Sequence, residues 1–267
     1  MLPAGGRRSG GALASRKCSR AGQGAHDVQD LSGIHRVSRC ELEIVRRPWP
    51  FAEEHAVAID AHWRTAASQN PNLFNGTIYM ARAAAITASP AGATFHATLS
   101  ATEFKAYFYW REQAFPEVGA RDLFGSALIR SAEGHVVLGR QRRGINAGLA
   151  YLPGGFIDPR DVTSEARVDL DASIAREIAE ETGLGGEDLT ALPGYILTFA
   201  EPLFSIAREH RSRLAGEAIR ARIRAHIESD PAAELADAVI VRHAGDLVDL
   251  AMPAYARVLL GWLFPPA

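Results

Sequence analysis

The segment Arg176–Leu184, REIAEETGL, constrains the fold of this chain more than any other. Side chains three and four positions apart lie on the same side of an α-helix, because each residue turns it by about 100°. Three glutamates therefore share one side, namely Glu177, Glu180 and Glu181. A second side, centred about 140° away, carries residues that a core would accept, namely Ile174, Ile178 and Thr182. The pattern predicts a helix that buries one face and collects negative charge on another.

The ends of this helix are also marked in the sequence. Asp171 precedes the motif, where its side chain would accept hydrogen bonds from the first backbone amides of the helix. Gly183 follows the last turn, in the position where helices often end in a left-handed residue. Arg176 stands four residues before Glu180, where it can pair with that carboxylate and fix its rotamer. We therefore expect a short helix that ends at Gly183.

Three carboxylates on one side of a helix repel one another, at a cost of roughly a few tenths of a kcal/mol per pair. A solvated helix face is the simplest explanation of such a cluster. A bound Mg²⁺ is the alternative, because this hard cation prefers carboxylate oxygens. The preceding loop, Pro153–Asp158, favours the alternative, since it ends a strand in two glycines that let a backbone carbonyl approach a metal or a phosphate.

Together, the loop and the helix resemble the Nudix box, the sequence motif of the Nudix hydrolases. The motif is Gly, five residues, Glu, seven residues, then Arg-Glu-apolar-x-Glu-Glu-x-Gly-apolar, and Arg176–Leu184 matches every specified position of its second half. In the first half Gly155 fits the glycine, but Asp161 stands where the family has Glu, and 14 residues separate it from Arg176. Two other residues are alternatives for this acidic position, namely Glu165 and Asp169, but Asp161 preserves the glycine spacing.

The resemblance implies a fold, a reaction and a set of site residues. The fold would be an α/β/α sandwich around a mixed sheet, and the reaction would be hydrolysis of a nucleoside diphosphate linked to a second group, X. By position, the ligands of one or more Mg²⁺ or Mn²⁺ ions would be the carbonyl of Gly155 and the side chains of Glu177, Glu180 and Glu181. Arg176 would orient the glutamates. Such ions would neutralise the diphosphate and lower the pKa of the attacking water.

The proton acceptor and the phosphate-binding residues stay open within this scheme. Glu177 and Glu181 are candidate bases in the motif, and Nudix enzymes also use a glutamate of a later loop, for which three residues are available, Glu201, Glu209 and Glu234. Phosphate oxygens would be held by guanidinium groups, and three arginines follow a core strand, Arg140, Arg142 and Arg143. A solvated sheet edge explains these arginines equally well.

The chain divides into three regions. Residues 1–36 carry seven glycines and six Lys/Arg against two Asp, without the apolar core of a signal peptide, and are expected to be a disordered tail. Residues 37–118 are expected to form a small α+β unit, with strands at 37–45, 77–87 and 94–100 and helices at 52–68 and 103–113. Ser100 and Glu103 have the spacing of a capping box. Residues 119–267 are expected to be the Nudix domain, with further strands at 123–130, 135–142, 194–200 and 236–242 and helices at 215–229 and 255–264.

The substrate is indicated only by the front of the chain. Asn70–Tyr79, NPNLFNGTIY, and the α+β unit around it resemble the N-terminal region of the UDP-sugar diphosphatase branch, whose products would be UMP and a sugar 1-phosphate. A turn followed by a strand explains the segment equally well, and the unit would then serve packing or formation of a homodimer. Two other functions stay open: a diphosphatase for ADP-ribose, dinucleotides or coenzyme A, and a Nudix-like sensor that binds a nucleotide sugar without cleaving it.

Composition bounds the partners. The formal net charge of −2 suggests neither a nucleic acid nor a membrane surface as a partner. No apolar run approaches the roughly 18 residues of a membrane helix. Cys18 and Cys40 cannot form a disulfide framework and lack the spacing of metal ligands. We therefore expect a small nucleotide as the substrate and the cytoplasm as the compartment.

Overall fold

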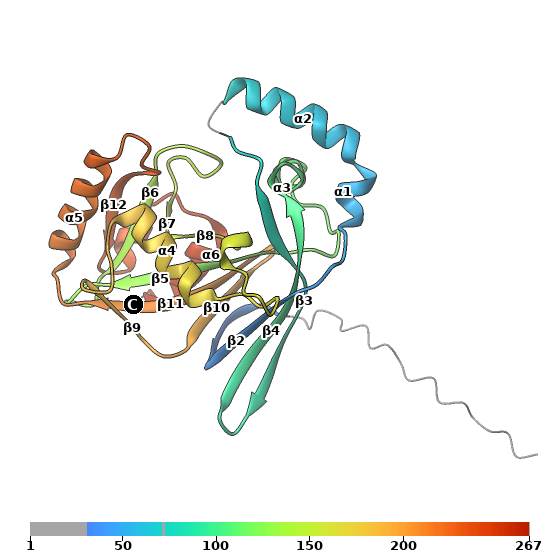
Figure 1. Cartoon of the computed structure of the whole chain (residues 1–267). Helices are drawn as coiled ribbons and strands as arrows, with labels where there is room; N and C mark the ends of the chain where they lie inside the picture. The colour runs from blue at the N-terminus through green and yellow to red at the C-terminus, as the bar shows by residue number, and fades with distance from the viewer. Residues whose placement is uncertain (1–30, 71–72, 267) are drawn as a thin grey trace, which may run out of the picture.

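The computed structural model describes residues 31–70 and 73–266, and its centre is a mixed β-sheet (Figure 1). The strands run in the order β1-β10-β11-β5-β6-β12. Their bounds are Gly33–Val37 (β1), Tyr195–Ala200 (β10), Leu203–Ser212 (β11), Asp122–Arg130 (β5), Val136–Gln141 (β6) and Leu235–Val241 (β12). Three short strands pair with this path, β7 (Ala150–Tyr151), β8 (Gly154–Phe156) and β9 (Leu189–Ala191). β5 and β11 are parallel, and the other pairs are antiparallel.

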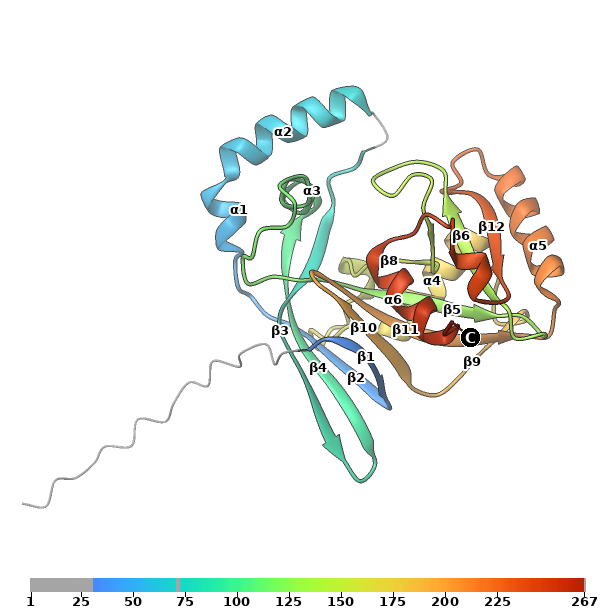
Figure 2. The ribbon, with the colours of Figure 1, turned by 180° about the vertical axis from the view of Figure 1, so that it is seen from behind.

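Helices cover both faces of this sheet. α4 (Leu170–Thr182) and α5 (Gly216–Ser229) pack together on one face, and α6 (Ala254–Leu263) lies on the other, as Figures 1 and 2 show from opposite sides. The apolar stripe of α5 is fully used, since Ile219, Ile223 and Ile227 are all buried. The α/β/α sandwich around a mixed sheet is therefore confirmed.

The first described strand corrects the prediction for the start of the chain. β1 pairs antiparallel with β10, from Gly33 against Phe199 to Val37 against Tyr195. Residues 33–36 were expected to belong to a disordered tail, and for them that expectation is wrong, while residues 1–30 lie outside the described part. The expected strand at 37–45 is also divided, because the chain leaves the main sheet at Ser38 and enters a second sheet at Arg39. Gly33, the half-buried His35 and the exposed Arg36 leave β1 without the apolar alternation that would predict a strand.

Removal of β1 is expected to destabilise the fold. A chain that starts at Ser38 should unfold with a free energy about 2–3 kcal/mol lower than a chain that starts at Leu31, because buried Val37 and a ladder of backbone hydrogen bonds are lost. The measurement is urea denaturation of the two chains, which differ in β1 and in the two residues before it, including the buried Leu31. Equal free energies of unfolding would show that the pairing of β1 with β10 contributes nothing.

A second, smaller sheet precedes the sandwich in the chain. Its order is β2-β4-β3, with bounds Arg39–Ile44 (β2), Gly92–Glu103 (β4) and Thr77–Ser89 (β3). Three helices accompany it, α1 (Pro50–Glu54), α2 (Ala56–Gln69) and α3 (Phe104–Glu112). Leu42, Phe95 and Leu99 belong to the same apolar core as the main sheet, so the front unit is continuous with the sandwich. A second apolar cluster, which includes Trp49 and Trp110, packs α1, α2 and α3 against β3.

The start of α3 differs from the predicted capping box. β4 continues to Glu103, Ser100 is buried within it, and neither side chain caps the helix. The side chain of Asn75 takes this role from the segment before β3, since its Oδ1 accepts a hydrogen bond from the Lys105 amide at 2.9 Å. The carbonyl of Gly76 also accepts a hydrogen bond from the Phe104 amide, at 2.8 Å. A local spacing rule could not find this cap, because its acceptor lies 30 residues away in sequence.

The insertion in the motif joins the two parts of the molecule. Residues 162–168 form a turn closed by a bridge between Val162 and Val168. The Ile44 amide donates to the Ala166 carbonyl at 2.8 Å, and the Val168 amide donates to the Leu42 carbonyl at 3.0 Å. The insertion therefore acts as a short extra strand along β2.

The sequence did not predict β11, because polar residues crowd its second half. In the structure it is the parallel partner of β5.

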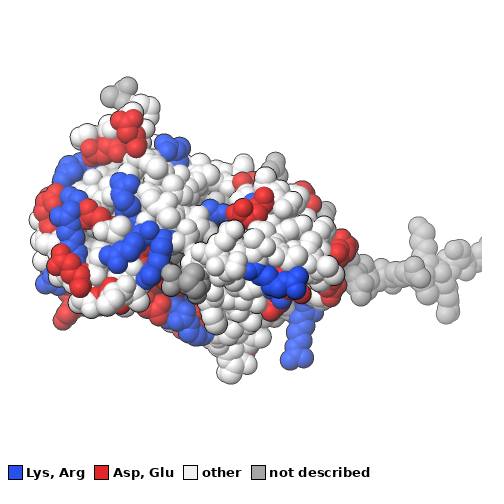
Figure 3. Space-filling view, turned by 90° about the horizontal axis from the view of Figure 1, so that it is seen from above, with Lys and Arg blue, Asp and Glu red and all other residues white. Residues whose placement is uncertain are grey.

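On the face seen in Figure 3, acidic and basic side chains are interspersed at one end. Among the described residues, no helix has the length and apolarity required to cross a membrane.

Candidate active site

A cavity of about 990 Å³ opens between the front unit and the sandwich. The front unit supplies part of its wall through α3 and the segment that leads into β3, including Ile78, Phe104 and Arg111. The sandwich supplies the rest, including the glycine pair of β8 and one side of α4. The front unit therefore forms part of the cavity wall.

The three glutamates of the motif lie on the wall of this cavity, namely Glu177, Glu180 and Glu181. Their helix begins as its sequence requires, but with a different cap: Asp169 accepts a hydrogen bond from the Ala172 amide, whereas Asp171 pairs with Arg208. Gly183 ends the helix in the left-handed conformation, with φ of 68°, as expected. The opposite face of α4 packs on β5 and is buried.

Glu181 is the most deeply placed of the three, with an exposed fraction of 5%. Its Oε1 accepts a hydrogen bond from the Tyr151 hydroxyl at 2.5 Å, and its Oε2 accepts one from the Gly154 amide at 3.2 Å. Burial raises the pKa of Glu181 well above its usual range, while the Tyr151 hydroxyl opposes this rise. The carboxylates of Glu177 and Glu234 raise its pKa further. The protein therefore leaves negative charge on this wall only partly compensated.

Glu177 lies directly against the glycine pair. A Cβ atom on Gly155 would lie 2.7 Å from the Glu177 Oε2, so any side chain at position 155 would collide with the carboxylate. Arg176 Nη1 donates to Glu177 Oε1 at 2.6 Å. Burial raises the pKa of Glu177 to about 7, and Arg176 opposes this rise. Glu180 and Glu234 raise the pKa as well, which indicates a second group with uncompensated charge beside the first.

Glu180 behaves differently, because it points to two arginines at the surface. Its carboxylate lies 3.2 Å from Arg160 Nη1 and 3.3 Å from Arg176 Nη1, and 52% of its side chain is exposed. Within the described ranges no three His, Cys, Asp or Glu side chains are placed to hold a metal ion together. The expected cage of three converging glutamates is therefore not formed in this arrangement.

The donor set nevertheless fits a hard divalent cation. Glu177 and Glu181 face the same cavity, carry charge that the protein compensates only in part, and lie beside glycines without side chains. Carboxylate oxygens are the ligands that Mg²⁺ and Mn²⁺ prefer. The role of the Gly155 carbonyl as a ligand stays a prediction.

Arg176 connects the motif helix with the first half of the motif. Its Nη2 donates to both carboxylate oxygens of Asp161, at 2.9 and 3.1 Å, while its Nη1 holds Glu177. Asp161 is buried and also accepts a hydrogen bond from the Asp158 amide, so it holds Arg176 in place and does not face the cavity. The two alternatives for the first acidic position of the motif do not take this role. Glu165 is exposed in the insertion turn, and Asp169 caps α4.

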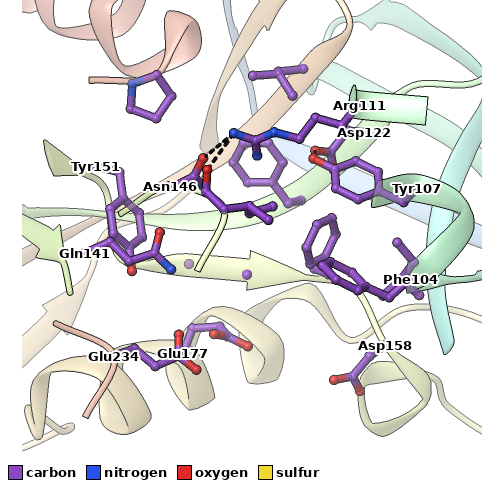
Figure 4. Close-up of a pocket in the computed structure, with 18 of the residues that line it drawn as sticks. Phe104, Tyr107, Arg111, Asp122, Gln141, Asn146, Tyr151, Asp158, Glu177 and Glu234 are labelled. Atoms are coloured by element: carbon purple, nitrogen blue, oxygen red, sulfur yellow. Dashed lines mark hydrogen bonds between the residues drawn. The ribbon is translucent and has the colours of Figure 1, made fainter. Parts of the chain in front are cut away.

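Among the later glutamates, Glu234 reaches the cavity. It stands just before β12 and lies beside Glu177 in Figure 4. Glu201 instead pairs with Arg121, at 2.5 Å, and does not line the cavity. Glu209 is a residue of β11 and pairs with Arg130 and Arg211, so its prediction as a loop residue is wrong.

The three arginines expected to bind phosphate do not line the cavity. Arg140 donates to the Gly148 carbonyl, Arg143 donates to the Ala232 carbonyl, and the side chain of Arg142 is exposed. The basic residues on the cavity wall are Arg111 of α3 and Arg160, which pairs with Asp158 and Glu180. Arg111 could not be found from motif spacing, because it lies 44 residues before Gly155, the first residue of the motif, and belongs to another unit.

Sequence reasoning also missed the tyrosines and the aspartate of the cavity. Tyr151 ends the strand before the glycine pair, and Tyr107 of α3 donates from its hydroxyl to Asp122 at 2.8 Å. The one signal that could have drawn notice is Asp122, an acidic residue at the start of an otherwise apolar strand.

Residues 124–233 match the family model of the NUDIX domain. No curated protein matches the chain in sequence.

Several solved structures are similar to part of the chain. The MutT protein from Methanosarcina mazei Go1 is 24% identical, with 51% of this chain and 88% of that chain covered and a TM-score of 0.35. The NUDIX domain of Shewanella oneidensis NrtR complexed with ADP ribose is 19% identical, with 60% and 93% covered and a TM-score of 0.32. A bifunctional NMN adenylyltransferase/ADP ribose pyrophosphatase from Francisella tularensis, complexed with AMP and a Mn ion, is 16% identical, with 59% and 44% covered and a TM-score of 0.37.

Proposed function

We propose that this chain, which contains a NUDIX domain at residues 124–233, is a hydrolase that cleaves the diphosphate bond of a nucleoside diphosphate linked to a second group, X. The observation that carries the proposal is the meeting of Glu177, Glu181 and the Gly154–Gly155 pair on one wall of a large cavity. A purely solvated acidic face, the simplest alternative, does not explain why Glu181 is buried and Glu177 lies against a glycine.

A bound Mg²⁺ or Mn²⁺ would neutralise the diphosphate and lower the pKa of the attacking water. Glu177 and Glu181 would hold this ion, with the carbonyl of Gly155 as a further ligand. Arg176 keeps Glu177 in place, and Tyr151 keeps Glu181 in place, so both carboxylates are oriented before a substrate arrives. Glu234 faces them and is the candidate proton acceptor for the attacking water.

The identity of X is the finer part of the proposal. The resemblance of Asn70–Tyr79 to the UDP-sugar diphosphatase branch makes UDP-sugars the first substrates to test. The contacts of Asn75 and Gly76 with the start of α3 give this segment a structural role of its own. ADP-ribose, dinucleotides and coenzyme A are therefore tested in parallel.

A substrate panel tests the proposed reaction. The full chain is incubated with a mixture of UDP-sugars, ADP-ribose, a dinucleotide and coenzyme A, and the products are identified by mass spectrometry. Release of a nucleoside monophosphate together with the phosphorylated X group would support the proposal. Tight binding of a nucleotide sugar without any cleavage would instead favour the sensor.

Removal of divalent ions is expected to abolish turnover. After dialysis against EDTA the rate should fall to background, because Glu177 and Glu181 repel the substrate's diphosphate when no cation lies between them. Addition of Mg²⁺ or Mn²⁺ should restore the rate, whereas K⁺ at equal ionic strength should not. Undiminished turnover in the presence of the chelator would contradict the assigned role of the acidic wall.

A further inference from the structure

The cavity has a second polar group far from the glutamates. Asp122, the first residue of β5, lies on its wall together with Tyr107 and Arg111 of α3. Figure 4 shows these three side chains at one end of the cavity and Glu177 with Glu234 at the other. The proposed function uses only the acidic end, so this cluster is without a role.

Asp122 is a buried carboxylate with capacity to accept another hydrogen bond. Only 4% of the residue is exposed. Its Oδ2 accepts from the Tyr107 hydroxyl at 2.8 Å, and its own amide donates to the Pro202 carbonyl, so its position is fixed. Among the described residues, Oδ1 is not one of the enclosed side-chain atoms that lack a partner, and Asp122 lies on the cavity wall. A donor group of a ligand in the cavity could therefore bond to Oδ1, since an ionised carboxylate accepts hydrogen bonds at both oxygens.

Arg111 supplies a positive charge that offsets the negative charge of Asp122 at this end of the cavity. Its Nη2 donates to the Ile145 carbonyl at 2.8 Å and to Asn146 Oδ1 at 3.0 Å, so it is anchored to the loop between β6 and β7. Burial raises the pKa of Asp122 to about 6, while Tyr107 and Arg111 oppose this rise. Asp122 is therefore mainly ionised at neutral pH, and the positive charge of Arg111 balances it. A neutral ligand group fits this end better than a charged one.

Aromatic rings form the remaining surface near Asp122. Tyr107 and Phe156 are in contact edge to face, with ring centroids 4.8 Å apart, and Phe104 lies 5.8 Å from Phe156. Phe115 and Phe124 also line the cavity. Such a wall accepts the flat face of a heterocycle or the C–H face of a sugar. One buried acceptor beside apolar rings selects for a neutral ring that carries an N–H or O–H donor.

We propose that Asp122, positioned by Tyr107, determines specificity for the group at the non-metal end of the substrate, by accepting a hydrogen bond from an N–H or O–H of a neutral ring that packs on the aromatic wall. This inference rests on the proposed function for the placement of the diphosphate. The donor belongs either to the nucleoside or to X, and the ligands used in the test separate the two.

Calorimetric titration with half-molecules of the substrate tests the inference. UMP, AMP and glucose 1-phosphate are titrated in the presence of Mg²⁺ into the full chain and into Asp122→Asn. The variant is expected to bind at least one of these ligands about tenfold or more weakly, because a hydrogen bond to a charged acceptor is replaced by a poorer one. Asp60→Asn, an exposed pairing partner of Lys105 outside the cavity, is the matched control and should bind like the wild type.

The pattern across ligands assigns the source of the donor. Weaker binding of the nucleotides alone places the nucleoside at Asp122, and weaker binding of glucose 1-phosphate alone places X there. In turnover assays the KM of the matching substrate should rise while kcat changes little. A general loss of structure would instead lower kcat as well. Unchanged affinity for all ligands in a folded Asp122→Asn variant would overturn the inference.

Two further measurements keep the outcome clear. If Asp122→Asn does not fold, Tyr107→Phe keeps the aromatic ring and removes the hydroxyl that fixes Asp122, and affinity for the same ligand should fall severalfold; wild-type affinity would overturn the inference. If the chain cleaves none of the panel substrates, the proposed function fails, yet the titrations still report on Asp122. If the chain cleaves a panel substrate but Asp122→Asn binds every ligand as the wild type does, the proposed function stands and the inference about Asp122 fails.

Discussion

Glu181→Gln is expected to lower kcat/KM by at least about 100-fold, the loss seen when one group that stabilises transition-state charge is removed. Glutamine keeps one oxygen that can accept the hydrogen bond from Tyr151, but its NH2 group cannot accept the hydrogen bond that the Gly154 amide donates to Glu181. The chain should nevertheless stay folded, even as turnover is lost.

The measurement combines steady-state kinetics with denaturation of the same preparation. Glu165→Gln is the matched control, because this glutamate lies exposed in the insertion turn and should retain full activity. A Mg²⁺ titration by calorimetry adds a direct readout, in which the affinity of Glu181→Gln should be reduced. A variant with wild-type rates and wild-type Mg²⁺ affinity would remove Glu181 from the site.

Arg176→Ala is expected to reduce both stability and activity. It leaves the carboxylate of Asp161, whose side chain is 2% exposed, without its charged partner, and a stranded buried charge costs about 3–5 kcal/mol. The same change frees Glu177 from its strongest contact, so kcat/KM should fall as well. Urea denaturation measures the first effect and steady-state kinetics the second.

A double-mutant cycle separates the two roles of Arg176. Asp161→Asn combined with Arg176→Ala removes both charges, so the double variant should recover part of the stability that Arg176→Ala loses, while its activity stays low. Losses of stability that simply add would show that the two residues do not form one unit. Such a result would leave Asp161 without its assigned structural role.

Periodic segments of the fold could be predicted from the sequence, and long-range pairings could not. The helix with three glutamates and the apolar stripe of α5 are local patterns, and both are observed. β1 pairs with a strand far along the chain, and β11 pairs with the distant β5 as well as with its neighbour β10. Polar residues interrupt the alternation of both strands. The predicted cap of α3 was wrong for the same reason, because the residue that caps this helix, Asn75, comes from a segment 30 residues away.

The same limit applies to the candidate site. The motif placed the glutamates and the glycine pair on one cavity, because its spacing encodes a strand, a turn and a helix in contact. It could not show that Glu180 turns to Arg160, because that arginine comes from the loop before the insertion. Nor could it select Asp122 or Arg111, whose meeting depends on how the front unit packs against the sandwich.

The pairing of the insertion with β2 also sets a rule for chimeric proteins. A graft of residues 31–118 from another protein onto this scaffold would leave the backbone groups of residues 162–168 without matching partners unless the loop were exchanged as well. Residues 31–118 and residues 162–168, although distant in sequence, would therefore have to be exchanged together. Residues 162–168 lie between Asp161 and the start of α4. Exchanging only one of the two segments would therefore disturb the alignment of the helix that carries the glutamates.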